Sequence, residues 1–257
     1  MNKITKLLSI VVLVCMVQTL KAQEYYGILF NDLEVNSNNA NDIFGDGLAS
    51  YILAENTLVL RDGFDYHLSR GYVNITTQND FTIRLEGDAE ITAAVKSEDN
   101  ISIEASEDCI LKITSNISGS ALKCPNLTIG SGVTLDLLSR NSSNDMHALE
   151  CNGNLIVNEA ILLAEVTTAR LAVKAQSMTL NGCWLAKPKG GRINPVEGGI
   201  CYADGITAKI VKITTIGYGI DENTGDGPAN TVKKVFENGQ ILIIKDGKKY
   251  NIAGQEF

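Results

Sequence analysis

Apolar and polar positions along the chain repeat in short triplets, in which a polar residue stands between two apolar or small ones. A period of two is typical of a half-buried β-strand, because successive side chains point to opposite faces. The triplets recur in the same order every 20 to 28 residues over the middle of the chain. This spacing indicates a repeat architecture whose strands are joined by loops of different length.

Each repeat contains three such triplets. The first strands are 75–77, 95–97, 122–124, 149–151 and 173–175, the second are 81–83, 101–103, 127–129, 155–157, 178–180 and 206–208, and the third are 89–91, 109–111, 133–135, 160–162 and 183–185. An antiparallel sandwich would show the same alternation but no recurrence of three triplets in one order. The pattern therefore predicts an all-β fold: a right-handed parallel β-helix with three short strands per turn and about six turns.

The predicted turns stack like residues into columns. The clearest inward column is that of the third strand: Ile91, Leu111, Leu135, Leu162 and Leu185. Cys109 and Cys183 fall in the other inward column of this strand, with Ala89, Val133 and Ala160. Cys124 and Cys151 are consecutive in an inward column of the first strand. They are either small buried fillers or partners in a disulfide between neighbouring turns, and both interpretations stay open.

Segments outside the repeat have other characters. We predict a signal peptide over 1–22, because Lys3 and Lys6 precede an apolar run that is too short to span a membrane. We predict an N-terminal β cap over 23–62, the parallel β-helix over 63–218 and a linker over 219–231. A C-terminal β module over 232–257 follows from the hairpin signals Asn238-Gly239 and Asp246-Gly247. The leader implies export to the periplasm, the outer surface or the medium.

The charge of the chain limits its partners. Removal of 1–22 takes away three lysines and no acid, so the formal net charge of −8 becomes −11. An acidic protein is a poor match for nucleic acid. We expect no metal and no cofactor, because His67 and His147 stand on different turns. The Asn-rich and Asp-rich loop 36–47 also lacks the residue order of a calcium loop, and its Asp42 and Asp46 indicate turns instead.

An enzyme that cleaves polysaccharides is one hypothesis, as a lyase or as a hydrolase with two carboxylates on one face. Against it, the outward column of the first strand, Thr76, Lys96, Lys123, Glu150 and Lys174, holds one carboxylate beside lysines and indicates ion pairing. Glu90 and Asp136 are assigned to different columns. The sequence shows no catalytic residues, and we expect a protein without catalytic activity.

Both ends of the chain resemble a known family. The segment Val35-Asn36-Ser37 to Gly45-Asp46-Gly47, followed by Thr57-Leu58-Val59-Leu60, resembles the opening of secreted or surface β-helix proteins of gut Bacteroidetes. These proteins are described as carbohydrate-binding-domain-like. The segment Cys183-Trp184-Leu185 with Pro188 to Gly191 resembles a late turn of the same family, and the tail from Val235 to Gln255 is similar to export and sorting modules of that phylum. The resemblance implies export and a β-helix, and it assigns no catalytic residue.

Surface recognition of glycans is the hypothesis that we favour from the sequence. Trp184 is placed outward, in a column with Glu90, Ile110, Thr134 and Ile161, where its ring would be a platform for a sugar. Tyr202, Lys187 and Arg192 are expected beside it, so these four residues form the predicted ligand site. Two alternatives stay open: the face is covered by a loop or by the C-terminal module, or the rod is a structural spacer without a sugar ligand.

Overall fold

The computed structural model describes residues 23–117, 119–140, 146–167, 171–194 and 198–215, and the strands of a C-terminal sheet between 232 and 250. The chain divides into two compact units, Met1–Thr214 and Thr215–Phe257, which are described separately. The predicted signal peptide 1–22, the predicted linker 219–231 and the turns Asn238-Gly239 and Asp246-Gly247 lie outside the described residues.

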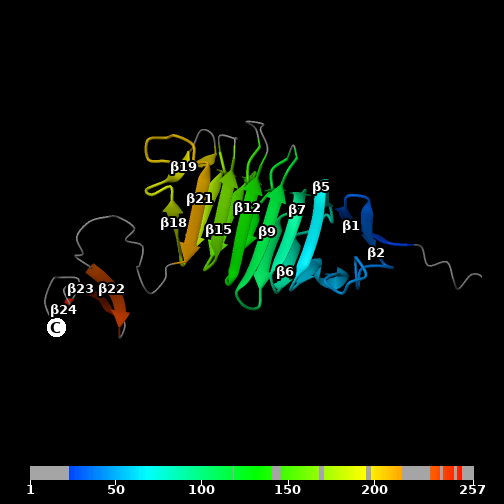
Figure 1. The fold of residues 1–257 in the computed structure, drawn as a ribbon, viewed down its shortest axis with the longest axis horizontal. Helices are drawn as coiled ribbons and strands as arrows, with labels where there is room; N and C mark the ends of the chain where they lie inside the picture. Colours follow the sequence, from blue (N-terminus) through cyan, green and yellow to red (C-terminus); the bar gives the residue numbers. More distant parts are fainter. Residues whose placement is uncertain are drawn as a thin grey trace, which may run out of the picture. The chain divides into compact units, whose positions relative to one another are not determined.

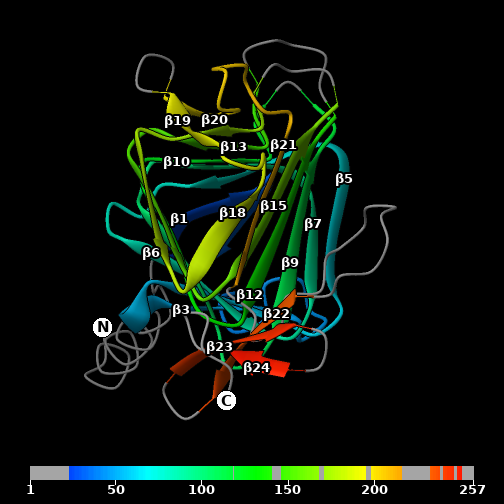
Figure 2. The same ribbon diagram turned by 90° about the vertical axis from the view of Figure 1, so that its left-hand side faces the viewer.

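The first unit is a parallel β-helix of about five turns, which confirms the predicted fold class. Figure 1 shows strands of successive turns side by side, from β5 through β7, β9 and β12 to β15. Figure 2 looks along the coil and shows its three sides. Two sides belong to one 14-stranded sheet, because β5 and β7 each continue through a corner, and the remaining side is a 7-stranded sheet.

The strands follow the three-part repeat. The 7-stranded sheet contains β3 (Ala49–Ile52), β4 (Thr57–Arg61), β6 (Phe81–Glu86), β8 (Ile101–Ala105), β11 (Leu127–Ile129), β14 (Asn154–Asn158) and β17 (Ser177–Asn181), with the 3-10 turn η1 (Leu53–Glu55) between its first two strands. The 14-stranded sheet contains β1 (Tyr25–Phe30), β2 (Leu33–Asn36), β5 (Phe64–Ile75), β7 (Ala89–Ser97), β9 (Cys109–Ser115), β10 (Leu122–Cys124), β12 (Val133–Ser139), β13 (Leu149–Cys151), β15 (Ile161–Val166), β16 (Val173–Lys174), β18 (Cys183–Lys187), β19 (Arg192–Asn194), β20 (Gly199–Cys201) and β21 (Ile210–Thr215).

The predicted register is correct in the middle of the coil and shifted near its start. Leu111, Leu135 and Leu162 pair in register, as do Leu122, Leu149 and Val173. At the start, Ile91 pairs with Ile113 instead of Leu111, and Ser97 pairs with Ile75 instead of Thr77. Both errors are shifts of two residues. A shift of two leaves every side chain on its predicted face, so the alternation cannot reveal it.

The last predicted turn is wrong, because the chain reverses direction there. β21 pairs antiparallel with β15, with Ile213 opposite Leu162, where Leu185 was expected. β20 likewise pairs antiparallel with β16, and the expected strand 206–208 is reduced to a single antiparallel bridge between Thr207 and Cys201. Alternating side chains suit both strand directions. The reversal explains why the coil has about five turns instead of about six.

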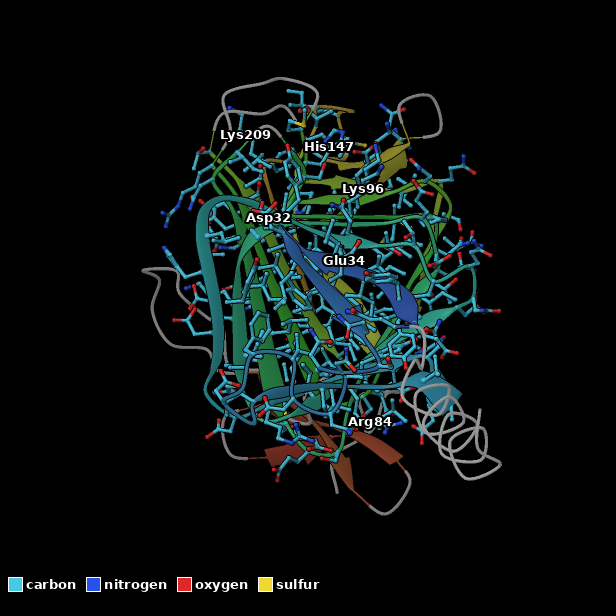
Figure 3. All side chains as sticks on the ribbon, turned by 90° about the vertical axis from the view of Figure 1, so that its right-hand side faces the viewer. Asp32, Glu34, Arg84, Lys96, His147 and Lys209 are labelled. Carbon is cyan, nitrogen blue, oxygen red and sulfur yellow. The ribbon has the colours of Figure 1, made fainter. Side chains whose placement is uncertain are left out.

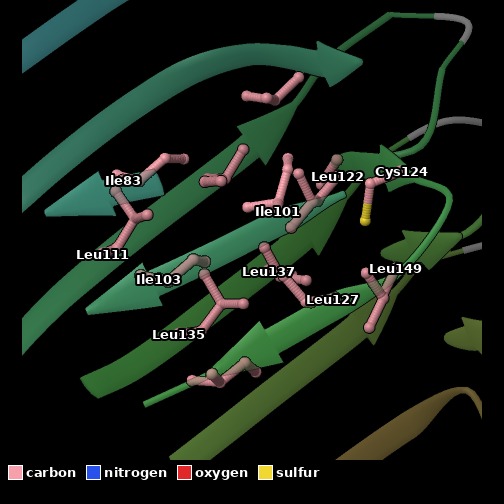
Figure 4. Packing of buried hydrophobic residues seen from close by; sticks show 14 of the residues in the cluster. Ile83, Ile101, Ile103, Leu111, Leu122, Cys124, Leu127, Leu135, Leu137 and Leu149 are labelled. Atoms are coloured by element: carbon pink, nitrogen blue, oxygen red, sulfur yellow. The ribbon is translucent and has the colours of Figure 1, made fainter. Parts of the chain in front are cut away.

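The core is a continuous column of apolar side chains inside the coil. Figure 4 shows inward residues from all three sides meeting there, among them Ile101, Leu122 and Leu135. Each of these three side chains is at most 1% exposed. Stacking of Ile, Leu and Val in register buries the apolar side of every strand, and this burial is the main favourable contribution to folding.

The described cysteines Cys109, Cys124, Cys151, Cys183 and Cys201 are all buried free thiols. Cys124 and Cys151 lie opposite each other in register, as predicted. Their side chains are hydrogen-bonded, and this bond, together with burial, raises the pKa of Cys124. The structure therefore has the filler arrangement and not the disulfide.

Aromatic rings close the N-terminal end of the coil. Figure 3 looks at this end and shows β1 and β2 lying across it, with Glu34 on β2 and Asp32 in the turn between the two strands. Beneath them the rings of Phe30, Phe44 and Tyr66 meet with centroids 5.1 to 5.4 Å apart. In the loop before β3, Asp42 Oδ1 accepts the backbone N–H groups of Gly45 and Gly47, so the predicted turn chemistry is confirmed. β4 pairs in parallel with β6, so the coil already begins at Thr57.

A ladder of charges crosses the outer side of the first strands. Lys123, Glu150 and Lys174 are consecutive in register, and Glu150 Oε1 lies 2.9 Å from Lys123 Nζ and 3.8 Å from Lys174 Nζ. Ser120 Oγ donates to Glu150 Oε2 at 3.1 Å. Burial by itself would raise the pKa of Glu150, but the hydrogen bond and charge of Lys123, with Ser120 and Lys174, outweigh it and lower that pKa. The predicted ion pairing is confirmed.

We expect Glu150→Gln to lower the free energy of unfolding at pH 7 by about 1 kcal/mol, since the carboxylate is mostly buried while its lysines are partly solvated. The folded pKa is lowered, so this stabilisation is complete above the unfolded value of about 4.3 and is lost as the pH falls through the folded value. Urea unfolding of the wild type and the variant at pH 7 and pH 3 measures the loss of stability at neutral pH and its disappearance in acid. Glu98→Gln, at an exposed carboxylate, is the control. An equal deficit at both pH values would contradict the account.

The second unit contains a three-stranded antiparallel sheet. Its strands are β22 (Val232–Glu237), β23 (Gln240–Lys245) and β24 (Lys248–Tyr250). β22 pairs with β23 from Val232 opposite Lys245 to Glu237 opposite Gln240, and β23 pairs with β24. This meander confirms the fold predicted for the C-terminal β module.

Candidate ligand-binding site

A pocket of about 500 Å³ opens where the N-terminal strands meet the first turn of the coil. It lies between β1, β3, η1 and the segment that follows β5. We call it the tyrosine pocket; its lining residues are Tyr25, Tyr26, Gly27, Tyr51, Leu53, Asn56, Thr76, Thr77, Gln78 and Asn79. Pockets that bind small molecules have volumes of roughly 300 to 1,000 Å³, so this one has room for a sugar.

A close approach of two backbones builds one wall of the tyrosine pocket. Gly27 O accepts the N–H of Thr76 at 2.7 Å and its hydroxyl at 3.2 Å. Gly27 has φ +74°, and a Cβ at this position would lie 2.5 Å from Thr76 O. Only glycine fits this left-handed and crowded position. The close approach brings Tyr25 and Tyr26, the two residues before Gly27, next to the segment 76–79.

A hydrogen-bond network fixes another part of the lining. Tyr51 donates its hydroxyl to Asn56 Oδ1 at 2.6 Å, and Asn56 Nδ2 donates to Thr77 Oγ1 and to the carbonyl oxygen of Asp80, both at 2.8 Å. Asn56 and Gln78 have left-handed backbones, with φ values of 49° and 67°. Such conformations in residues other than glycine gather at functional sites. The amide of Asn56 thereby joins the cap to the segment after β5.

Aromatic rings pack against one another at the pocket. The Tyr26 and Tyr51 centroids are 5.4 Å apart at an angle of 37°, and Tyr51 stacks on Phe81 at 6.5 Å and 15°. Burial, and then the neighbouring Tyr26, raise the pKa of Tyr51. The phenol of Tyr51 is protonated at neutral pH, as an ordinary tyrosine is, and acts as a hydrogen-bond donor.

Other groups at the pocket are open to a ligand. The Tyr25 side chain is 61% exposed and Leu53 is 53% exposed. Within the part of the chain that the structure describes, the hydroxyls of Tyr25 and Tyr26 and the side-chain amide of Gln78 make no hydrogen bond. The pocket thus combines apolar ring faces with donors and acceptors that have no protein partner in this region. This is the composition of a site for a molecule with both apolar and hydroxyl surfaces.

The predicted site of Trp184, Tyr202, Lys187 and Arg192 lies at the other end of the coil. Trp184 is 50% exposed and Tyr202 is 44% exposed. Pairing of β19 with β20 places Arg192 opposite Cys201, the residue before Tyr202. Lys187 ends β18, the strand that carries Trp184. The structure therefore brings Arg192 and Tyr202 together and leaves Trp184 on a separate strand.

The column predicted to hold Trp184 needs correction. Ile110, Thr134 and Ile161 are in register, but β21 lies between β15 and β18 in the sheet, so Trp184 does not follow Ile161. Glu90 leaves this column as well, because it pairs with Lys112. The reason is physical: the chain reverses at its last turn, and the first turns are shifted by two residues. The predicted column is therefore not formed, although Trp184 points outward as predicted.

The assignment of Glu90 and Asp136 to different columns is also wrong. Both pair in register with Lys112, one on each side, so they share an outward column. Lys112 Nζ lies 2.9 Å from Glu90 Oε1. Burial raises the pKa of Asp136, while the charge of Lys112 opposes this shift. The cation between the two acids makes the column an ion-pair ladder and not an open pair of catalytic carboxylates.

The two histidines stand apart in the coil. His67 is exposed in β5, whereas His147 is buried with its Nδ1 2.9 Å from Leu171 O. Among the described residues, no three side chains of His, Cys, Asp or Glu are grouped closely enough to hold a metal ion.

No family model, curated protein or solved structure matches the chain. In the described part of the chain, no helix has the length and apolar character needed to cross a membrane.

The sequence interpretation missed the tyrosine pocket. Nine of the 15 aromatic residues lie between Tyr25 and Phe81. This concentration was the available signal, but the cap was assigned a closing role only. The structure shows that its rings do both: one group fills the end of the coil, and Tyr25, Tyr26 and Tyr51 line the pocket.

Proposed function

We propose that this protein is an exported, non-catalytic carbohydrate-binding protein and that the tyrosine pocket holds the sugar. One observation carries the proposal: a pocket that combines the exposed ring of Tyr25 and the half-buried ring of Tyr26 with hydroxyl and amide groups that have no partner among the described residues. The C–H face of a sugar packs on an aromatic ring, and its hydroxyls exchange hydrogen bonds with amides and phenols. The apolar leader at 1–22 and the resemblance of both ends to exported β-helix proteins support export.

The rigidity of the pocket favours binding. The walls are fixed before a ligand arrives, because the Asn56 amide network and the contact of Gly27 with Thr76 hold both sides. A site that is already ordered loses less conformational entropy on binding. In a site that has to become ordered, this entropy loss would lower the affinity for the sugar.

Two alternatives make different predictions. A glycan site at Trp184, Tyr202, Lys187 and Arg192 would also give sugar binding, carried by the other end of the coil. A structural spacer would give none. The exposed rings of Trp184 and Tyr202 keep the first alternative open to test.

Glycan-array binding of the purified protein, beside Tyr25→Ala and Trp184→Ala, separates these possibilities. We expect Tyr25→Ala to weaken binding by up to about tenfold, because an aromatic contact contributes up to about 1.5 kcal/mol. Tyr25 is mostly exposed, so its loss leaves the fold intact. Trp184→Ala is the matched control and is expected to bind as the wild type does.

The opposite result, with binding lost in Trp184→Ala and kept in Tyr25→Ala, would move the site to the other end of the coil. If none of the three proteins binds any plant, host or bacterial glycan, and circular dichroism shows that all three are folded, glycan recognition is rejected. The spacer would then be the leading account.

A further inference from the structure

The side chains that line the tyrosine pocket carry no charge at neutral pH. They are tyrosine, leucine, asparagine, threonine and glutamine, together with one glycine. Burial raises the pKa of the Tyr51 phenol above its ordinary value. Every hydrogen bond that this lining offers to a ligand is therefore a bond between neutral groups.

The charges around the pocket are acidic. Asp99 Oδ2 accepts the N–H of Thr77 at 2.6 Å, the hydroxyl of Thr77 at 3.0 Å and the N–H of Gln78 at 3.2 Å. This carboxylate lies directly behind the wall. Glu24 is exposed beside Tyr25, and Asp80 follows Asn79 at the rim.

Two basic side chains near the pocket, Arg84 and Lys96, are already paired with carboxylates, and Lys96 Nζ lies 3.6 Å from Glu98 Oε1. Arg84 Nη2 lies 2.8 Å from Glu55 Oε2, next to the Asn56 wall. An arginine in an ion pair with a carboxylate has its charge and its fork of donors occupied. Recognition of a carboxylate or sulfate normally uses an arginine or lysine that is open to the ligand.

We propose that the tyrosine pocket selects uncharged glycans and rejects glycans that carry carboxylate or sulfate groups. This inference rests on the proposed function and adds the class of ligand. A neutral sugar replaces its hydrogen bonds to water with bonds to phenol, amide and hydroxyl groups. An anionic sugar would lose hydration without meeting a cation and would lie within a Debye length of Asp99, Asp80 and Glu24.

The opposite end of the coil offers the contrasting chemistry. Lys187 and Arg192 are exposed there, close in the chain to Trp184 and Tyr202. If the protein bound acidic glycans, their anionic groups would form ion pairs with Lys187 and Arg192 at that end. The charge of the bound glycan therefore distinguishes the two sites.

The test compares the affinity of each glycan that binds on the array with that of a partner of equal chain length. If the glycan is neutral its partner is acidic, and if it is acidic its partner is neutral. A neutral glycan is oxidised at C6 to the uronate, and an acidic glycan is converted to its methyl ester. In 20 mM salt we expect the neutral member of each pair to bind at least about fivefold more tightly. The difference is expected to shrink in 0.5 M salt, because exposed charges are then screened.

Substitution of Gln78 checks the cause. Gln78→Lys places a cation at the rim and removes the amide for both partners, so the ratio of the affinities, carboxylated partner over neutral partner, is expected to rise about fivefold. Gln78→Glu, which removes the same amide and adds an anion, is the matched control and is expected to lower this ratio further. Equal effects of both substitutions on the two partners would overturn the electrostatic explanation.

The inference and the proposed function fail in different ways. Tighter binding of the carboxylated partner that Tyr25→Ala abolishes would overturn the charge selection while glycan recognition by the pocket stands. Binding of acidic glycans that is lost in Arg192→Ala but not in Tyr25→Ala would overturn the pocket as the site. No binding of any glycan would overturn both proposals.

Discussion

Replacement of Leu135 by alanine is expected to lower the free energy of unfolding by about 3 to 5 kcal/mol, the cost typical of a fully buried leucine. Leu135 is 0% exposed and pairs in register with Leu111 on one side and Leu162 on the other. The coil cannot close around the missing atoms, because the neighbouring turns fix the spacing of the strands. The substitution thus leaves a cavity in the middle of the apolar column.

Urea unfolding measures this loss, and Thr134→Ala is the control. Thr134 is the neighbour of Leu135 on the same strand and points outward, so its substitution is expected to change the stability by less than about 0.5 kcal/mol. Similar losses in the two variants would contradict the inward and outward assignment of β12. The midpoint of a reversible, two-state transition is the quantity to compare.

Replacement of Asn56 by alanine has the second large effect. It is expected to lower the stability by about 3 kcal/mol, because it removes the hydrogen bonds to Tyr51, Thr77 and Asp80 and places alanine in a left-handed backbone. The pocket wall also loses its support, so glycan affinity is expected to fall about tenfold or more.

Asn56→Gly separates the two causes. Glycine adopts the left-handed backbone without strain but has no amide. We expect this variant to be about 1 to 2 kcal/mol more stable than Asn56→Ala and equally poor in glycan binding. Thermal unfolding and binding to the selected glycan are measured for both. A glycine variant that binds as the wild type does would show that the amide network does not support the pocket.

The repeat made the body of the coil predictable from the sequence. Alternation marks the inward side of each strand, and the order of the three triplets marks the sides of the coil. The pairs Cys124 with Cys151 and Leu135 with Leu162 followed directly from this pattern. Such pairs are determined locally, since neighbouring turns must bury apolar residues against each other.

The ends of the coil were less predictable, for two physical reasons. A register shift of two residues keeps every side chain on its face, so Ile91 was placed opposite the wrong partner. Antiparallel strands show the same alternation as parallel ones, so the reversal at β20 and β21 gave no signal. The outward direction of Trp184 was predicted correctly, but its place directly after Ile161 was wrong because β21 reverses and lies between β15 and β18.

The tyrosine pocket depends on contacts between distant segments. Tyr25, Tyr51 and Thr77 come together only because Gly27 approaches Thr76 and Asn56 reaches Thr77. Neither contact has a periodic pattern in the sequence. The left-handed backbone of Asn56 at the end of a 3-10 turn is likewise a local conformation that many asparagines adopt.

The most direct test of the central claim is an NMR titration of the protein, labelled at its tyrosine and tryptophan rings, with the neutral oligosaccharide that binds best on the array. The account predicts shifts in the ring resonances of Tyr25, Tyr26 and Tyr51, and unchanged resonances for Trp184 and Tyr202. Shifts at Trp184 and Tyr202 with an unperturbed Tyr25 would contradict it and would place the sugar at the other end of the coil.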